Sequence, residues 1–113
     1  MKKIEVILMP DKFEAVKSML EIEGYADIMT SEIQHHGKGI SLTQMWRGTE
    51  YRVAQTKLKV EVFIPKNEDV KKIIKEITKI AAGSTLGDSK MFVYDIAEAH
   101  AVLSTEKEKI SLN

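Results

Sequence analysis

The sequence contains no cysteine, and its 17 basic residues are balanced by 17 acidic ones. The lack of cysteine excludes a disulfide framework, thiolate metal ligands and thiol chemistry. The formal net charge of zero removes the basic surface expected of a nucleic-acid-binding protein. Long apolar runs are also missing: the N-terminal run, residues 4–9, contains Glu5 and stops at Pro10. That run is too short for a signal peptide or a membrane span.

What the sequence does contain is enough for one folded domain. Of its 113 residues, 43% are hydrophobic and 30% are charged. This length leaves no room for a second domain of ordinary size, and the composition can form a buried core. We therefore expect a single cytoplasmic domain over residues 1–113, without a nucleic-acid partner and without insertion into a membrane.

The first 36 residues show a strand, a helix and a second strand. Residues 3–9 are apolar and rich in β-branched side chains, which predicts a buried strand. Asp11 is expected to cap a helix whose apolar residues recur at three- and four-residue steps and which ends near Gly24. Residues 26–36 predict a strand with a weaker pattern.

The middle of the sequence, residues 37–51, follows no sustained period. It contains Gly37, Gly39 and Gly48 among polar residues, which indicates a loop or a flexible hairpin. A loop of this length in so small a domain is usually functional or disordered.

The second half again shows a strand, a helix and a strand. Residues 58–64 alternate between apolar and polar side chains, as in a half-buried strand. Asn67 and Asp69 are candidate caps of the next helix. A strand over residues 90–96 and a polar tail over residues 104–113 follow. The apolar stripe of the predicted helix consists of Val70, Ile73, Ile74, Ile77, Ile80 and Ala81.

This order of elements predicts an α+β, ferredoxin-like βαββαβ fold, with two helices on one face of an antiparallel sheet. Alternation along the strands directs Val60 and Val62 to one side. The other face of the sheet then has no cover of its own. Because self-association is the simplest cover, we expect a homo-oligomer.

Three segments of the sequence carry motifs in a fixed order. The chain opens with Met-Lys-Lys-Ile-Glu, followed by Pro10 and Lys12. The later segments are Trp46-Arg47-Gly48-Thr49-Glu50-Tyr51 and Ser84-Thr85-Leu86-Gly87-Asp88-Ser89-Lys90-Met91-Phe92-Val93. Together they resemble the PII nitrogen-regulatory signal proteins. Those proteins share a T-loop signature, Tyr-Arg/Lys-Gly-Ala/Ser-Glu-Tyr, and a Gly-Asp-Gly-Lys loop before a strand.

The resemblance implies a homotrimer that binds ATP or ADP, with AMP as a further candidate, in clefts between subunits. It leaves magnesium open. Glycines let the backbone approach phosphate oxygens, and lysines supply compensating charge. The nucleotide-binding residues that it implies are Gly37, Lys38, Phe63, Ile64, Gly87, Asp88, Ser89 and Lys90.

The resemblance also implies that a T-loop, about residues 37–55, docks onto a membrane transporter or a metabolic enzyme. Trp46 and Arg47 are of the residue types enriched at the centres of interfaces. Tyr51 aligns with a tyrosine that some family members modify by nucleotidylation, although an exposed loop tyrosine is more often unmodified.

The sequence departs from the family at several ligand positions. Lys38 and Gly39 stand where the family usually has arginine and glutamine, and that glutamine helps to hold magnesium and 2-oxoglutarate. Ala101 and Leu103 replace two arginines that reach a neighbour's phosphates, and Ser89 replaces a glycine. We therefore expect altered nucleotide binding and no 2-oxoglutarate sensing.

Other readings of the sequence stay open. A protein-interaction module that has lost nucleotide binding is the main alternative. An enzyme, such as a slow nucleotide hydrolase using Asp88 and Glu50, lacks support from any catalytic motif, and we assign no catalytic residue. We assign no metal site either: His35 and His36 are adjacent and would face opposite sides of a strand, although His100 could approach either one in a trimer.

Overall fold

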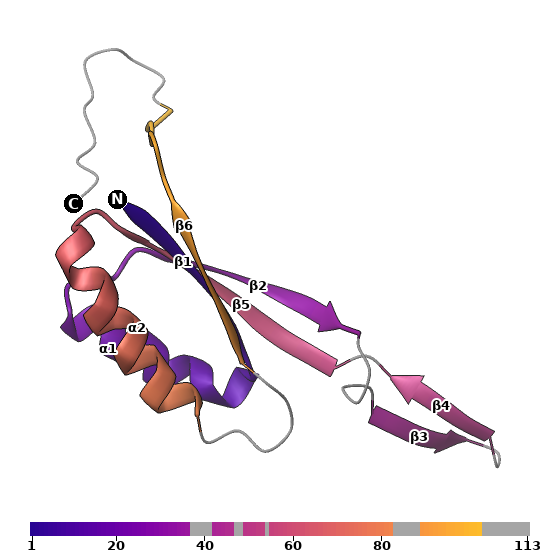
Figure 1. Ribbon diagram of the computed structural model, residues 1–113. Helices are drawn as coiled ribbons and strands as arrows, with labels where there is room; N and C mark the ends of the chain where they lie inside the picture. Colours follow the sequence, from indigo (N-terminus) through magenta and orange to yellow (C-terminus); the bar gives the residue numbers. More distant parts are fainter. Residues whose placement is uncertain (37–41, 47–48, 54, 83–88, 103–113) are drawn as a thin grey trace.

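A computed structural model describes residues 1–36, 42–46, 49–53, 55–82 and 89–102. The described residues form an antiparallel four-stranded sheet of strand order β2-β5-β1-β6, with two helices packed on one face (Figure 1). The elements are β1 Lys2–Leu8, η1 Pro10–Lys12, α1 Phe13–Ile22, β2 Ile28–His35, β3 Leu42–Trp46, β4 Thr49–Val53, β5 Gln55–Ile64, α2 Asn67–Ala81 and β6 Lys90–Asp95. The predicted ferredoxin-like fold is confirmed, with a two-stranded β3-β4 sheet added between β2 and β5.

The hydrophobic core lies between the sheet and the helices. Register pairs Ile4 with Val62 and Val6 with Val60, and all four side chains are buried. The helices contribute the buried side chains Val16, Leu20, Val70, Ile73 and Ile77. Burying one such side chain stabilises the fold by about 1.5–3 kcal/mol. The alternation in β5 and the apolar stripe of α2 therefore predicted the core.

The expected helix caps are wrong. Asp11 lies inside the 3-10 turn η1, and α1 begins after Lys12 without a capping side chain. Pro10 at the start of the turn, with its fixed φ, favours this tight entry. At α2 the cap position is Lys66, so Asn67 and Asp69 are already helical. The predicted end of α1 is confirmed, because Gly24 follows the cap residue Glu23 with a φ of +93°, which glycine adopts without strain.

Strand β5 is longer than its alternating pattern predicts. It begins at Gln55 rather than near residue 58, because the pairing with β2 continues to His35 opposite Gln55. Its pairing with β1 already stops at Leu58 opposite Leu8. The β2–β5 pair therefore extends beyond the rest of the sheet. The long pairing with β5 thus compensates for the weak apolar pattern of β2.

Neither of the two described helices lies over the opposite face of the sheet, which we call the open face (Figure 1). In the register, its residues include Lys3, Glu5, Ile7, Met29, Ser31, Ile33, Lys59, Glu61, Phe63, Phe92 and Tyr94. Large apolar side chains among them stay in contact with solvent: Met29 is 65% exposed and Phe92 is 46% exposed. This mixture of apolar and charged groups sets the open face apart from the core face.

The β3–β4 hairpin lies within the segment predicted as a T-loop. It projects past the end of the β2–β5 pair, away from the helices (Figure 1). The two strands are antiparallel, with Trp46 opposite Thr49 and Tyr51 opposite Gln44. The sequence left open whether this segment is a loop or a hairpin, and the structure shows paired strands in it.

Candidate functional site

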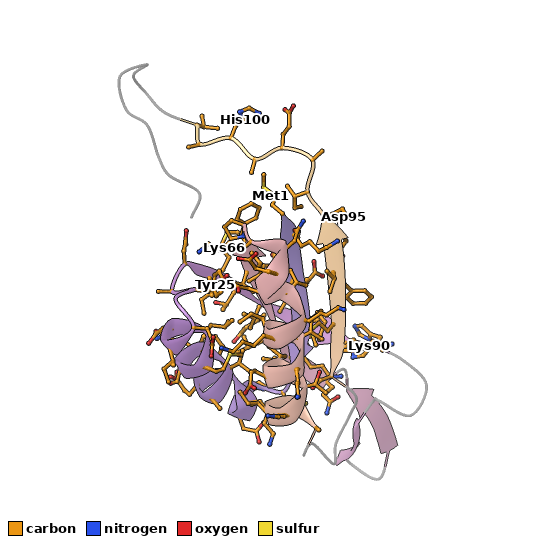
Figure 2. All side chains as sticks on the ribbon, turned by 60° about the vertical axis from the view of Figure 1, so that its left-hand side comes forward. Met1, Tyr25, Lys66, Lys90, Asp95 and His100 are labelled. Carbon is orange, nitrogen blue, oxygen red and sulfur yellow. The ribbon has the colours of Figure 1, made fainter. Side chains whose placement is uncertain are left out.

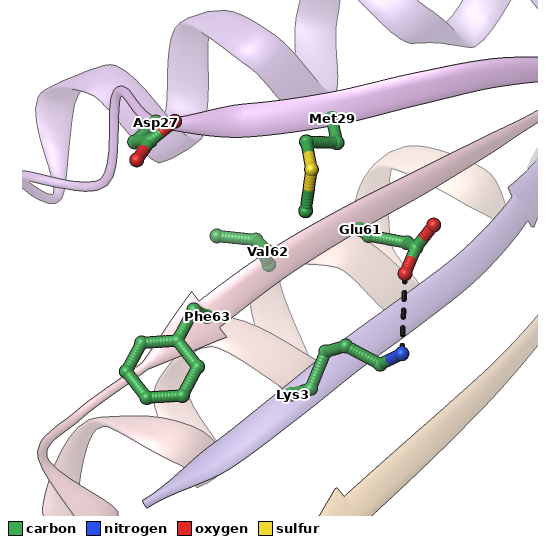
Figure 3. A pocket seen from close by; sticks show the side chains of 6 residues that line it. All are labelled: Lys3, Asp27, Met29, Glu61, Val62 and Phe63. Atoms are coloured by element: carbon green, nitrogen blue, oxygen red, sulfur yellow. Dashed lines mark hydrogen bonds and ion pairs between the residues drawn. The ribbon is translucent and has the colours of Figure 1, made fainter. Parts of the chain in front are cut away.

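A pocket of about 170 Å³ opens on the sheet near the start of β1 and the end of β5 (Figure 3). Three neighbouring parts of the sheet form it, namely β1, β5 and the start of β2. Its lining residues are Lys3, Asp27, Met29, Glu61, Val62 and Phe63. The Phe63 ring and the Met29 side chain give it apolar walls, and a flat aromatic ring is a surface on which a planar base can stack.

Charged groups at the edge of the pocket hold one another in place. Lys3 Nζ donates a hydrogen bond to Glu61 at 3.1 Å, drawn as a dashed line in Figure 3. This hydrogen bond raises the pKa of Lys3 above its ordinary value of 10.5, so the ammonium group stays charged. Lys3 Nζ also lies 4.8 Å from the centre of the Tyr94 ring, a cation–π distance. The pocket therefore combines an apolar wall with fixed donors and acceptors.

The two strand residues that the sequence assigned to nucleotide binding occupy different environments. Phe63 lines the pocket. Ile64 points the other way, is 0% exposed and belongs to the hydrophobic core. Neighbouring residues of a strand face opposite sides of a sheet, so a ligand on the open face reaches only the main chain of Ile64.

Lys90 lies at the opposite end of the sheet from the pocket. Register places Lys3 opposite Phe63, and Ile7 opposite Lys90. Along the strand direction the two sites are therefore four residues of β1 apart, roughly 13 Å, and they lie on the two strands that flank β1. Figure 2 shows Lys90 at the end of β6 nearest the β3–β4 hairpin. The structure thus places Phe63 and Lys90 along one sheet rather than in one pocket.

A second polar region lies where β2 ends. His35 is opposite Gln55, and Lys57 follows two residues later on β5. Gln55 and Lys57 are both buried, Lys57 to 1% exposure. The positive charges of Lys57 and Lys90 both act on the His35 imidazole. Sequence reasoning missed Gln55 and Lys57, because their burial depends on pairing that extends beyond the recognisable alternation.

Several predicted site residues lie outside the described part of the chain. They are Gly37, Lys38, Arg47, Gly87 and Asp88, together with the substituted position Gly39. Ser89 and Lys90 are described, at the start of β6. Of the two positions where the family has arginines, Ala101 is described and exposed, whereas Leu103 lies outside the described residues. The structure therefore brings together only part of the implied ligand set.

The pocket partners Lys3, Glu61 and Met29 were not predicted from the sequence. Glu61 could have been predicted, because it lies two residues before Phe63 on the same strand and therefore faces the same side of the sheet. Lys3 and Met29 come from elsewhere in the chain, and only the register brings them next to β5.

The hairpin residues chosen as docking candidates are only partly described. Trp46 ends β3 and Tyr51 lies in the middle of β4. Arg47 lies in the connection outside the described residues. These positions stay predictions.

The described residues contain neither a helix that could cross a membrane nor a cluster of metal ligands. No helix in this part of the chain is long and apolar enough to cross a membrane. No group of three or more histidine, aspartate or glutamate side chains among the described residues could hold a metal ion. His100 instead pairs with Glu98 at 3.0 Å, near the end of the described chain.

The fold and the open-face pocket define a ferredoxin-like α+β domain with a projecting hairpin. A family model described as nitrogen regulatory protein P-II matches residues 1–107. The chain belongs to this family of regulatory proteins.

The sequence is similar to those of curated relatives over nearly its whole length. The chain is 32% identical to nitrogen regulatory protein P-II 2 of Methanothermobacter thermautotrophicus over 110 residues, covering 96% of this chain and 95% of the relative. It is also 32% identical to nitrogen regulatory protein P-II of Pasteurella multocida, covering 96% and 97%. With nitrogen regulatory protein P-II 1 of Escherichia coli K12 the identity is 29% over 113 residues, covering 99% and 100%.

Proposed function

We propose that this protein is a homotrimeric, cytoplasmic PII-type regulator that binds ATP or ADP between its subunits. It acts on a membrane transporter or a metabolic enzyme through the segment around residues 37–55. The observation that carries the proposal is the layout of the open face. An aromatic pocket lies at one end, a lysine lies at the other, and the surface between them has no cover from the described chain.

The separation of the two ends suits an extended nucleotide. A base stacked on Phe63 would leave its phosphates pointing along the sheet toward Lys90, which lies roughly 13 Å away along the strand direction and two strands across. A lysine ammonium group is a common partner of phosphate oxygens. The glycine-containing stretch that precedes Lys90 is the segment whose sequence resembles the family's phosphate loop.

The open face also supports self-association. Phe92 and Tyr94 of β6 are both more than 40% exposed, and so is Met29 of β2. They share a face with half-buried Ile7 and Ile33. Apolar groups gathered on one face are covered at low free-energy cost by the same face of another subunit. A nucleotide held between subunits would complete the pocket.

The substitutions suggest that the effector is the nucleotide alone. Gly39 offers no side-chain oxygen to a magnesium ion or to 2-oxoglutarate. Exposed Ala101 offers no guanidinium to a phosphate. These two residues also favour the second candidate function, a docking module that has lost its ligand.

Isothermal titration with ATP, ADP and AMP tests the proposal, with and without magnesium and 2-oxoglutarate. Micromolar binding of ATP or ADP that 2-oxoglutarate leaves unchanged is the expected result. Binding that tightens with 2-oxoglutarate would show that Gly39 does not prevent its recognition. No heat and no thermal shift with any nucleotide would leave the docking module.

Sedimentation equilibrium of the same sample tests the assembly. The expected mass is three times the 12.8 kDa of one chain. A monomeric mass at micromolar concentration would contradict the trimer and, with it, a site between subunits.

A further inference from the structure

Two side-chain contacts tie the turn between α1 and β2 to the beginning of α2, and we call them the clasp. Tyr25 Oη donates a hydrogen bond to Asp69, in the first turn of α2. Two residues before this tyrosine, Glu23 Oε2 lies 2.8 Å from Lys72 Nζ, further along the same helix. Figure 2 shows Tyr25 beside the start of α2, near Lys66. The clasp therefore connects two parts of the chain that are far apart in sequence.

The two contacts of the clasp differ in strength. The Lys72 side chain is 61% exposed, and an exposed ion pair contributes little. The Tyr25 side chain instead packs against the hydrophobic core, and its hydrogen bond is partly buried and made to a carboxylate, which makes it the stronger contact. The acceptor is itself held in place, because a carboxylate in the first turn of a helix interacts favourably with the helix N-terminus. Tyr25 is therefore the main link.

The clasp lies next to the β2 side of the open-face pocket, at the point where strand pairing ends. The pairing of β2 with β5 starts at Ile28 opposite Val62. Asp27, which lines the pocket, lies one residue outside that pairing. The β5 side is held separately, because Phe63 pairs with Lys3 of β1. The nearest hydrogen-bonded side chain on the other side of Asp27 is the tyrosine of the clasp.

The same hydrogen bond also connects both sides of the pocket through the chain. Tyr25 precedes Asp27 by two residues, and Asp69 follows Phe63 by six. Between Phe63 and Asp69 the chain passes from the end of β5 into α2. Asp27 and Phe63 both line the pocket (Figure 3). One hydrogen bond behind the sheet thus joins the segments that carry these two lining residues.

We propose that Tyr25 is a positioning residue of the pocket, and that its hydrogen bond to Asp69 sets the width between the two sides for a planar base. The inference rests on the proposed nucleotide function and adds the contact that shapes the base end of the site. Without the hydroxyl, the segment of Asp27 occupies more positions, and only some of them fit a base. The apparent affinity falls by the fraction of molecules that keep the binding shape. Since one hydrogen bond is lost, the expected effect is about two- to tenfold.

Three variants and a control test the hydrogen bond. Tyr25→Phe and Asp69→Ala each remove one of its partners, and the double variant removes both. Glu68→Ala is the matched control, because Glu68 is exposed and is the other acidic residue in the first turn of α2. Circular dichroism shows whether each variant is folded. ADP is then titrated into every protein, and amide hydrogen exchange is followed along the chain without ligand.

Tyr25→Phe and Asp69→Ala are each expected to bind ADP about two- to tenfold more weakly than the wild type. The double variant should bind no more weakly than the weaker single variant, because both single changes remove the same bond. Glu68→Ala should match the wild type. Exchange in Tyr25→Phe should be faster over residues 25–29 and unchanged in β1 and β6.

Two results would overturn the proposal while leaving the nucleotide function standing. One is wild-type ADP affinity in folded Tyr25→Phe. The other is weaker binding together with faster exchange throughout the sheet, which would mean a general loosening of the fold.

The exchange measurement also separates the two proposals if the wild type does not bind ADP. The nucleotide function then falls. Faster exchange confined to residues 25–29 in Tyr25→Phe would still support the clasp as the contact that positions this side of the pocket. Unchanged exchange there would remove the clasp as well.

Discussion

Strand β5 presents Val60 and Val62 to the helices and Lys59 and Glu61 to the open face, so one strand serves two surfaces of different composition. The buried cluster on the core face is apolar and depends on burial, which has no preferred direction. The open face depends on specific neighbours: Glu61 lies 3.1 Å from Lys3 Nζ and 3.8 Å from Lys59 Nζ. The difference teaches that fold and recognition are divided between opposite sides of the same strands.

The largest expected effect comes from charging the open face. Phe92→Glu would place a carboxylate opposite Glu5 and inside the proposed subunit contact. An ion buried without a partner costs several kcal/mol, so the proposed trimer should dissociate to monomers in sedimentation velocity. Ile22→Glu, at a site on α1 that is 84% exposed, is the control and should stay trimeric. A trimeric Phe92→Glu would place the assembly contact elsewhere.

Substitutions on the core face should change the stability of the fold rather than its assembly. Leu20→Ala removes a fully buried side chain of α1 and should lower the free energy of unfolding by about 2–5 kcal/mol. Ile22→Ala on the same helix should change it by less than about 0.5 kcal/mol. Chemical denaturation of both variants measures the difference. Similar losses in the two would mean that the outer side of α1 is also covered in solution.

Lys90→Ala tests the ligand end of the open face. The loss of one charged hydrogen bond to phosphate, about 1.5–3 kcal/mol, should weaken ATP binding by about 10- to 150-fold without unfolding the protein. Lys75→Ala, at an exposed position of α2, controls for the loss of a positive charge. Equal affinities for the two variants in isothermal titration would remove Lys90 from the site.

The smallest effect belongs to a contact outside both faces. Tyr25 Oη donates a hydrogen bond to Asp69, and burial together with this bond raises the pKa of Tyr25 to about 12. The neutral tyrosine is therefore favoured in the fold, and its contribution is complete below pH 10 and disappears as the pH rises through about 12.

Tyr25→Phe should cost about 1 kcal/mol at neutral pH. The variant has no such hydroxyl to titrate, so the stabilities of wild type and variant should converge as the pH rises from 10 toward about 12. Denaturation curves recorded at several pH values measure both. A difference that stays constant up to the highest pH would show that the tyrosine hydroxyl is not the titrating group.

The sequence predicted the fold well where a single strand or helix carries its own periodicity. The stripe containing Ile73 and Ile77 and the alternation of Val60 and Val62 depend only on local spacing, and each pointed to the core. The caps failed because Pro10 changes the entry into α1 and Tyr25 engages Asp69 from another part of the chain. Such contacts do not show in local spacing.

The candidate site was less predictable for the same reason. Phe63 and Lys90 were chosen by resemblance, whereas Lys3, Glu61 and Lys57 come next to other polar groups only because strands meet after folding. Ile64 shows the limit of resemblance, since matching a position does not say which face its side chain occupies.

The length of β5 constrains how a bound ligand can influence the hairpin. This strand carries Phe63 near one end and Lys57 near the other, and a single residue separates it from β4. Sliding β5 by one residue would turn its buried valines to the open face, a prohibitive change. In the proposed function, a ligand effect carried by this strand would therefore not be a translation of β5. It would be a change in how tightly the hairpin end of β5 is held, while the rest of the strand stays in register.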